Sequence, residues 1–309
     1  MEKIDLVVPY VDANDPEWQK LYNKYNPSEE KNEQTNALSR FRGQGDFFKY
    51  FFRCLDKNLP WLNKVHLLVQ SKSQIPSWLD TTKLHIVLHE EFIPQEYLPT
   101  FNSTCIEMFL YRIPELSEHF IYANDDTFAI KPLKPEDFFK DGLIKTNTSN
   151  SGGLNTLFGH HRVNGYCLIY GKNKEEVMKQ GVVMSLPHLI RPYLKSQMEA
   201  CFNEHKEAIL NSISKFREEK NLNVYMFDHY IIKNHKQYPR EGVHSKCIFS
   251  SSEDRFLEIM FDTKSDYFEK HNFNMICIQD NKEDINIYEN YYISNYFKII
   301  YKNKSNYEK

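Results

Sequence analysis

Two adjacent aspartates that follow a short apolar run are the first residues in this sequence to suggest chemistry. The run "FIYA", residues 120–123, has the pattern of a buried strand, and Asn124, Asp125 and Asp126 come directly after it. Neighbouring carboxylates repel each other, but a divalent cation removes the repulsion and can in turn hold a diphosphate. The same residues would also suit a turn, which Asn and Asp favour. The dipeptide alone leaves both interpretations open.

Other polar residues have roles that the sequence pattern alone does not decide. Glu107 stands inside the apolar segment "CIEMFLYRI", and its side chain could face water or lie close to the two aspartates. In a pair of carboxylates, one can hold a metal ion while the other acts as a base or orients a partner. Arg40 and Arg42, in "SRFRGQGD", present planar forks that match phosphate oxygens, although surface charge is the simpler interpretation. His188 and Arg217 on their own fit ordinary structural and surface positions.

The composition is that of a globular chain without a strong charge bias. The 309 residues are 41% hydrophobic and 26% charged, enough for one large domain or two small ones. The net charge of −3 gives no electrostatic reason to expect nucleic acid as the main partner. Aromatic residues reach 15%, which we attribute mainly to the core, although sugar-binding proteins also expose aromatic faces.

The cysteines and apolar runs bear on the cellular compartment. The six cysteines are widely spaced, so the sequence predicts neither a zinc knuckle nor a CxxC motif, and Cys54 and Cys105 fit reduced core positions. The first residues, "MEKIDLVVPY", enter a strand without a signal-peptide pattern. No apolar run approaches the ~20 residues of a membrane span. We therefore expect a cytoplasmic protein with no transmembrane segment.

Strand and helix patterns alternate through the first 140 residues, which is typical of a mostly parallel α/β sheet. The predicted strands are 4–10, 64–70, 84–90 and 120–123, and the predicted helices are 46–59 and 102–113, with another that starts at Pro16. Ligands bind outside the carboxyl ends of parallel strands, where Asp12, Asp125 and Asp126 stand.

The later part of the chain is predicted to be richer in helices. From Pro187 to about His235 the pattern is helical, with His188 at the start of a helix. The segments "KCIFSSS" and "MICIQDN" have the pattern of strands. The C-terminal segment begins as an aromatic-rich amphipathic helix.

Several segments together resemble the Stealth family of hexose-1-phosphate transferases, which act in the synthesis of bacterial capsules and surface polysaccharides. They are "IDLVVPYVDANDPEW", "RFRGQGDFFKYFFRCLDKNLPWLNKVHLLV", "IPSWLD", "LPTFNSTCIEMFLYRIPELSEHFIYANDDTF" and "KSNYEK". The catalytic core of the eukaryotic lysosomal-enzyme N-acetylglucosamine-1-phosphotransferase is similar. The resemblance implies an α/β fold with a mostly parallel, Rossmann-like or GT-A-like sheet flanked by helices and with a helical C-terminal portion. It also implies a single catalytic domain over 1–309, with a nucleotide-sugar-binding half at 1–140 and a helix-rich half at 155–309 that completes the active site.

The resemblance also assigns roles to single residues. It implies that Glu107, Asp126, His188 and Arg217 are catalytic, and that Asp125 and Asp126 hold Mg²⁺ or Mn²⁺ on the diphosphate of the donor. The implied donor-binding residues are Tyr10, Asp12, Asp15, Trp18, Arg40, Arg42, Asn102, Asn124, Lys304 and Ser305. We expect Tyr307 to anchor the C-terminal tail while Lys304 and Ser305 face the active-site cleft; a solvated, dispensable tail is the alternative.

The reaction that the resemblance implies starts from a UDP-hexose or a UDP-N-acetylhexosamine. A hydroxyl of a growing oligosaccharide or polysaccharide, free or lipid-linked, would attack the β-phosphorus, and UMP would leave. Either Glu107 or His188 would orient or deprotonate that hydroxyl. A metal-dependent glycosyltransferase that releases UDP and a non-catalytic carbohydrate-binding protein are the alternatives. The expected location is the cytoplasm, free or peripheral at the inner face of the membrane.

Overall fold

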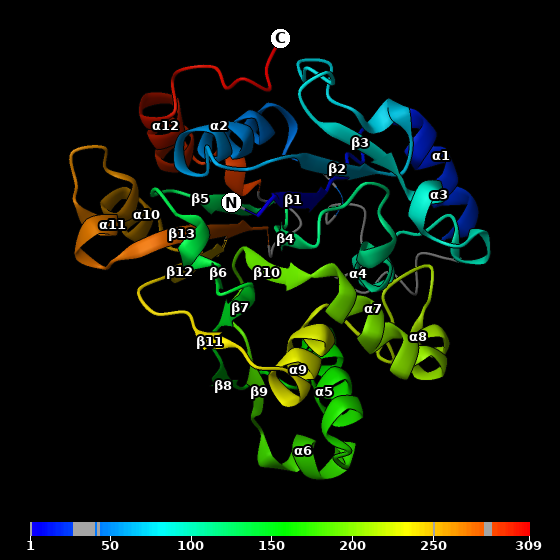
Figure 1. Ribbon diagram of the computed structural model, residues 1–309. Coiled ribbons are helices and arrows are strands. Elements are labelled where there is room, and N and C mark those ends of the chain that lie inside the picture. Colours follow the sequence, from blue (N-terminus) through cyan, green and yellow to red (C-terminus); the bar gives the residue numbers. More distant parts are fainter. Residues whose placement is uncertain (1, 27–40, 42–43, 250, 281–285) are drawn as a thin grey trace.

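A five-stranded sheet in the order β10-β4-β1-β2-β3 forms the centre of the computed structural model, which describes residues 2–26, 41, 44–249, 251–280 and 286–309 (Figure 1). Four of its strands run parallel, namely β1 (Ile4–Pro9), β2 (Val65–Val69), β3 (His85–Leu88) and β4 (His119–Tyr122). The fifth, β10 (Arg191–Leu194), pairs antiparallel with β4. The prediction of a mostly parallel α/β sheet is confirmed.

Smaller sheets lie beside the central one. One has the order β12-β13-β5, another β11-β7-β6, and a third pairs β8 with β9. Their strands are β5 (Thr127–Ala129), β6 (Phe139–Lys140), β7 (Leu143–Thr146), β8 (Ser149–Ser151), β9 (Val183–Ser185), β11 (Tyr238–Pro239), β12 (His244–Phe249) and β13 (Phe273–Gln279). Strands β12 and β13 confirm the prediction for "KCIFSSS" and "MICIQDN".

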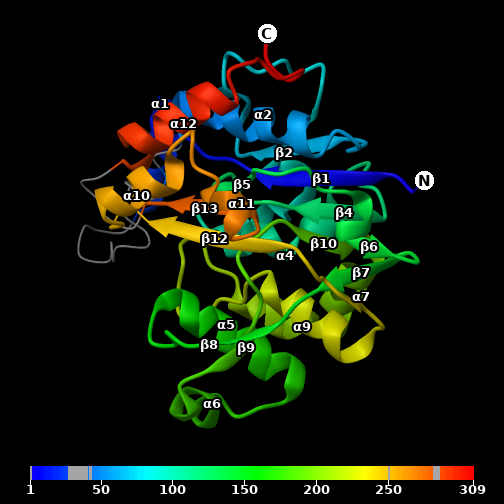
Figure 2. The same cartoon turned by 90° about the vertical axis from the view of Figure 1, so that its left-hand side faces the viewer.

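Helices cover the central sheet and build a second layer away from it. They are α1 (Pro16–Tyr25), α2 (Phe48–Asn58), α3 (His89–Phe92), α4 (Ser103–Met108), α5 (Leu157–Tyr170), α6 (Lys174–Gln180), α7 (Lys195–Glu204), α8 (Lys206–Ser212), α9 (Tyr225–Asn234), α10 (Asp254–Phe261), α11 (Tyr267–Lys270) and α12 (Tyr291–Ile300). Figures 1 and 2 show α2 and α12 together on one side of the sheet, and α5, α6 and α9 grouped on the other.

The apolar patterns of β1 and α2 explain how the core forms. Leu6, Val7 and Val8 are fully buried, as expected for a parallel strand that is covered on both faces. Helix α2 buries Phe48 and Phe52 on its apolar side. The largest cluster of buried apolar side chains extends from β1 to the end of α12, so both halves of the chain contribute to it.

The segment from Pro187 to His235 differs from its prediction. Helices α7, α8 and α9 do form there, but residues 191–194 are strand β10, paired with β4 through Arg191 to Leu194. Pro192 suits this place because an edge strand tolerates a missing backbone N–H. His188 therefore lies in the loop before a strand, and its expected position at the start of a helix was wrong.

Candidate active site

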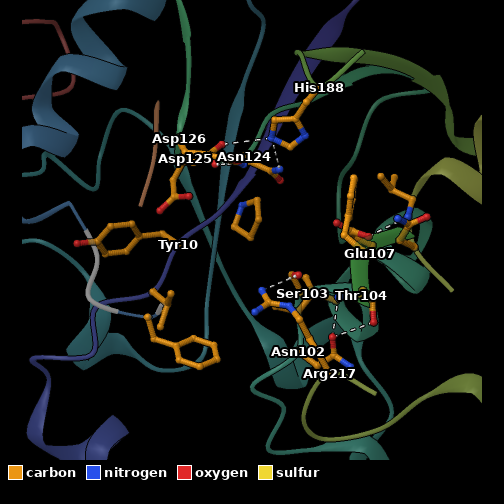
Figure 3. Close-up of a pocket in the computed structure, with 18 of the residues that line it drawn as sticks. Tyr10, Asn102, Ser103, Thr104, Glu107, Asn124, Asp125, Asp126, His188 and Arg217 are labelled. Carbon is orange, nitrogen blue, oxygen red and sulfur yellow. Dashed lines mark hydrogen bonds and ion pairs between the residues drawn. The ribbon is translucent and has the colours of Figure 1, made fainter. Parts of the chain in front are cut away.

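A cavity of about 710 Å³ lies at the carboxyl ends of the parallel strands (Figure 3). Tyr10 follows β1 and residues 124–126 follow β4, so neighbouring strands deliver their side chains to one place. Helix α4 and the start of α9 line the cavity as well. This is where open α/β sheets bind their ligands.

The two adjacent aspartates have different environments. Asp126 accepts hydrogen bonds from Thr127 at 3.1 Å and Gln279 at 3.0 Å, and its Oδ1 atom lies 3.5 Å from Nε2 of His188. Burial disfavours its charge, but the bonds from His188, Gln279 and Thr127 and the charge of His188 outweigh burial and lower the pKa of Asp126. For Asp125, burial and the charge of Asp126 together raise the pKa to about 8. Asp126 is thus held as a carboxylate, whereas the raised pKa of Asp125 disfavours its charged form.

His188 completes a pair with Asp126 on this side of the cavity. Its Nε2 atom also lies 3.2 Å from the side-chain nitrogen of Asn124, the first residue of the "NDD" segment. Burial would lower the pKa of His188, but the hydrogen bond and charge of Asp126 outweigh burial and raise it. A histidine whose ring is oriented by a carboxylate is the arrangement of a general base.

Glu107 faces the same cavity from helix α4 (Figure 3). One carboxylate oxygen accepts a hydrogen bond from the backbone N–H of Val224 at 2.8 Å, and the other accepts one from the hydroxyl of Tyr122 at 3.3 Å. Burial raises the pKa of Glu107 despite these bonds and the nearby charges of Arg191 and Arg217. Because both oxygens are engaged, the geometry suits a side chain that orients a partner.

Two arginines bring positive charge to the cavity wall. Arg217 donates a hydrogen bond to Ser103 at 3.1 Å, and its guanidinium lies 5.7 Å from the ring centre of Phe41. Arg191 was not among the predicted site residues. It forms a buried ion pair with Asp228 at 2.9 Å and lies 3.7 Å from the ring centre of Tyr225. No signal in the sequence marked it, because its partner comes from a distant helix.

The structure brings some of the other predicted site residues to the cavity and leaves others away from it. Tyr10, Trp18, Asn102 and Asn124 line it. Asp15 instead caps helix α1 and accepts hydrogen bonds from Ser73 and Gln74. Asp12 shapes the same loop, since its carboxylate accepts from the backbone of Asn14. Arg40 and Arg42 lie outside the described residues.

The structure does not place the C-terminal tail at the cavity as expected. Lys304 donates to the backbone oxygen of Lys309 at 2.8 Å, and Ser305 is buried against Glu308. Neither is among the residues that line the cavity. The ring of Tyr307 packs on Phe52 with 5.3 Å between centres, so the tail is held to the domain away from the candidate site.

Some polar side chains in the cavity wall were missed by sequence reasoning. Gln44, His89 and Asn223 are buried and each has side-chain atoms without a hydrogen-bond partner among the described residues. Burial lowers the pKa of His89 to about 4, which keeps its ring neutral. Buried polar atoms without partners are costly, and these three side chains stand in the wall of the cavity.

The donor atoms at this end of the cavity suit a divalent cation. One oxygen of Asp126, one nitrogen of His188 and the sulfur of Cys277 all lie within 4.8 Å of one another. Asp125 adds a carboxyl group whose pKa is raised to about 8, and a bound cation would relieve the repulsion between the two carboxylates.

Among the described residues, no helix is long and apolar enough to cross a membrane.

Comparison with known proteins gives a consistent set of relatives. Conserved region 2 of the Stealth proteins matches residues 40–146. The capsular polysaccharide phosphotransferase WcwK of Streptococcus pneumoniae is 35% identical over 75% of this chain and 79% of its own length. The receptor polysaccharide phosphotransferase WefC of Streptococcus oralis is 35% identical over 76% of this chain and 80% of its own. A second WcwK of Streptococcus pneumoniae is 30% identical over all of both chains.

Among solved structures, the galactosyltransferase LgtC in complex with donor and acceptor sugar analogs aligns with 94% of this chain and 95% of its own. The sequence identity is 9% and the TM-score 0.43.

Proposed function

This chain belongs to the Stealth family, and because the relatives described above are named polysaccharide phosphotransferases, we propose that it transfers a sugar phosphate to a hydroxyl of a surface polysaccharide. The proposed donor is a UDP-hexose or a UDP-N-acetylhexosamine, and the acceptor is an oligosaccharide or polysaccharide, free or lipid-linked. The observation that carries the proposal is the pairing of His188 with Asp126 in one cavity with Glu107 and Arg217.

Charge at the donor phosphates is the first requirement of phosphoryl transfer. The guanidinium of Arg217 presents a planar fork that suits phosphate oxygens, and it stands on the cavity wall beside Ser103. Asp125, with Asp126 beside it, would hold Mg²⁺ or Mn²⁺. When bound, the cation would neutralise charge on the diphosphate.

Deprotonation of the acceptor hydroxyl is assigned to His188. Its Nε2 atom faces Asp126, so Nδ1 is the nitrogen that would receive the proton. The hydroxyl oxygen then forms a bond to the β-phosphorus, and the bond from that phosphorus to the oxygen bridging the α-phosphorus breaks. UMP takes the electron pair of the broken bond, and the sugar phosphate becomes a phosphodiester. Glu107, with both oxygens engaged, orients the acceptor or its neighbouring groups.

A panel of UDP-sugars tests the proposal and identifies the donor. Each would be incubated with the purified chain, a capsule oligosaccharide and Mg²⁺ or Mn²⁺, and the released nucleotide would be separated by chromatography. We expect acceptor-dependent UMP from at least one donor, and none from the His188→Ala variant. UDP as the product would indicate a glycosyltransferase, and no turnover with any donor would favour a binding protein. Because nucleotide sugars are cytoplasmic substrates, the proposed location is the cytoplasm, free or at the inner face of the membrane.

A further inference from the structure

Two cysteines that are far apart in the sequence meet beside the Asp126–His188 pair. Cys247 in β12 and Cys277 in β13 are direct partners in the parallel pairing of these strands. Side chains of paired residues in a parallel sheet point to the same face, so the two thiols lie side by side, and the sulfur of Cys277 is within 4.8 Å of an oxygen of Asp126. Cys277 is fully buried, whereas Cys247 is half-buried and lines the cavity. Asp126, His188 and Cys247 thus line the cavity, whereas Cys277 is not among its lining residues.

The donor atoms in this cluster differ from those of a magnesium site. An oxygen of Asp126, a nitrogen of His188 and the sulfur of Cys277 lie within 4.8 Å of one another, and Cys247 is the strand partner of Cys277. Magnesium takes oxygen ligands in octahedral geometry. A set of sulfur, nitrogen and oxygen donors that can surround one point suits a softer, tetrahedral ion, above all Zn²⁺.

We infer that Asp126, His188, Cys277 and Cys247 form a binding site for a thiophilic divalent cation such as Zn²⁺, and that its occupation inhibits the enzyme. A cation bound there would take the ring nitrogen and the carboxylate that form the Asp126–His188 pair, so His188 could not accept a proton in concert with Asp126. The thiols would lose their protons to solvent on binding. Binding follows from the cluster alone, whereas inhibition rests on the proposed function.

Cobalt reports directly on thiolate ligands, because Co²⁺ replaces Zn²⁺ in such sites and absorbs in the near ultraviolet when sulfur is bound. The full chain, reduced and freed of metal, would be titrated with Co²⁺ and then with Zn²⁺. We expect a thiolate-to-cobalt band that Zn²⁺ abolishes. Cys277→Ser should weaken Co²⁺ binding at least ~10-fold and remove most of this band. Cys167→Ser is the matched control, since Cys167 is a half-buried free thiol in α5, outside the cluster.

Cys247→Ser provides a second variant, because a change at the fully buried Cys277 could also disturb folding. It should weaken the band while the circular dichroism stays that of the unchanged chain. A cobalt spectrum without a sulfur band, or one identical in the unchanged chain and both variants, would overturn the inference.

Inhibition is measured separately, on turnover of a UDP-sugar at saturating Mg²⁺ or Mn²⁺. We expect Zn²⁺ to inhibit the unchanged chain and the Cys167→Ser control, and to inhibit Cys277→Ser at least ~10-fold more weakly. Equal inhibition of all three would overturn the inhibitory role. A sulfur band in a chain that turns over no UDP-sugar would support the binding site and count against the proposed function, so the two failures are distinguishable.

Discussion

The Nε2 atom of His188 lies 3.5 Å from Oδ1 of Asp126, while Gln279 donates to the other carboxylate oxygen at 3.0 Å. The carboxylate is thus fixed on one side and faces the histidine on the other. This geometry predicts that Asp126 and His188 act as one catalytic unit, in which neither works well without its partner.

A double-mutant cycle tests that coupling. Asp126→Asn and His188→Ala should each lower kcat at least ~100-fold, the usual scale for a positioned acid–base group. The double variant should be little worse than either single one, since residues that act as a unit have strongly non-additive effects. The measurement is kcat for the three variants, with circular dichroism to confirm folding. Losses that multiply would show that the two residues act independently.

Metal dependence is expected because burial and the neighbouring charge of Asp126 raise the pKa of the Asp125 carboxyl group to about 8, and a bound cation would offset both effects. Chelation by EDTA should abolish transfer, and Mg²⁺ or Mn²⁺ should restore it. Asp125→Asn should raise the metal concentration for half-maximal activity at least ~10-fold, because it removes a charged ligand. Asp262→Asn, at an exposed position that does not line the cavity, is the control. Full activity in exhaustively chelated enzyme would show that transfer requires no metal ion.

Arg217 is expected to stabilise charge on the transferred phosphate. Arg217→Ala should lower turnover at least ~100-fold, and Arg217→Lys should recover only part of it, because a point charge lacks the planar fork. Arg255→Ala, on the exposed part of α10, should have no effect. Near-normal turnover of Arg217→Ala would show that another cationic side chain stabilises the phosphate charge. Arg191 would then be the next residue to substitute.

The C-terminal tail is expected to contribute stability and not catalysis. Both carboxylate oxygens of Glu308 accept hydrogen bonds from Arg53 at 2.7 Å, and the Glu308 side chain is 4% exposed. Glu308→Ala leaves a mostly buried guanidinium without this partner, which should cost about 3 kcal/mol of the free energy of unfolding. We expect a lower Tm with kcat preserved, whereas Lys304→Ala should leave Tm unchanged. A loss of kcat at unchanged Tm would instead show that the tail contributes to catalysis.

The parts of the fold that local patterns determine could be predicted from the sequence. Strands β1, β2 and β4 are short apolar runs, and the polar residues after β4 indicate where it ends. The apolar pattern around Glu107 could not show that its side chain faces a cavity, because α4 is buried on more than one side. Only the family resemblance pointed to that residue, and to His188 and Arg217.

Features that depend on contacts between distant segments could not be predicted. Residues 191–194 form a strand because β4 offers an edge, and nothing in the segment itself indicates that pairing. The register of β12 on β13 pairs Cys247 with Cys277, and their spacing in the sequence does not indicate this pairing. The buried pair of Arg191 and Asp228 has the same origin.

The fate of the β-phosphorus tests the central claim most directly. A UDP-sugar labelled with ³²P at the β-phosphate would be incubated with the chain and its polysaccharide acceptor, and the polymer would be separated from nucleotides. If the chain is a sugar-phosphate transferase, the label enters the polymer in a linkage that phosphatase does not remove, and unlabelled UMP appears in equal amount. Label that stays in UDP while unlabelled sugar enters the polymer would contradict the account.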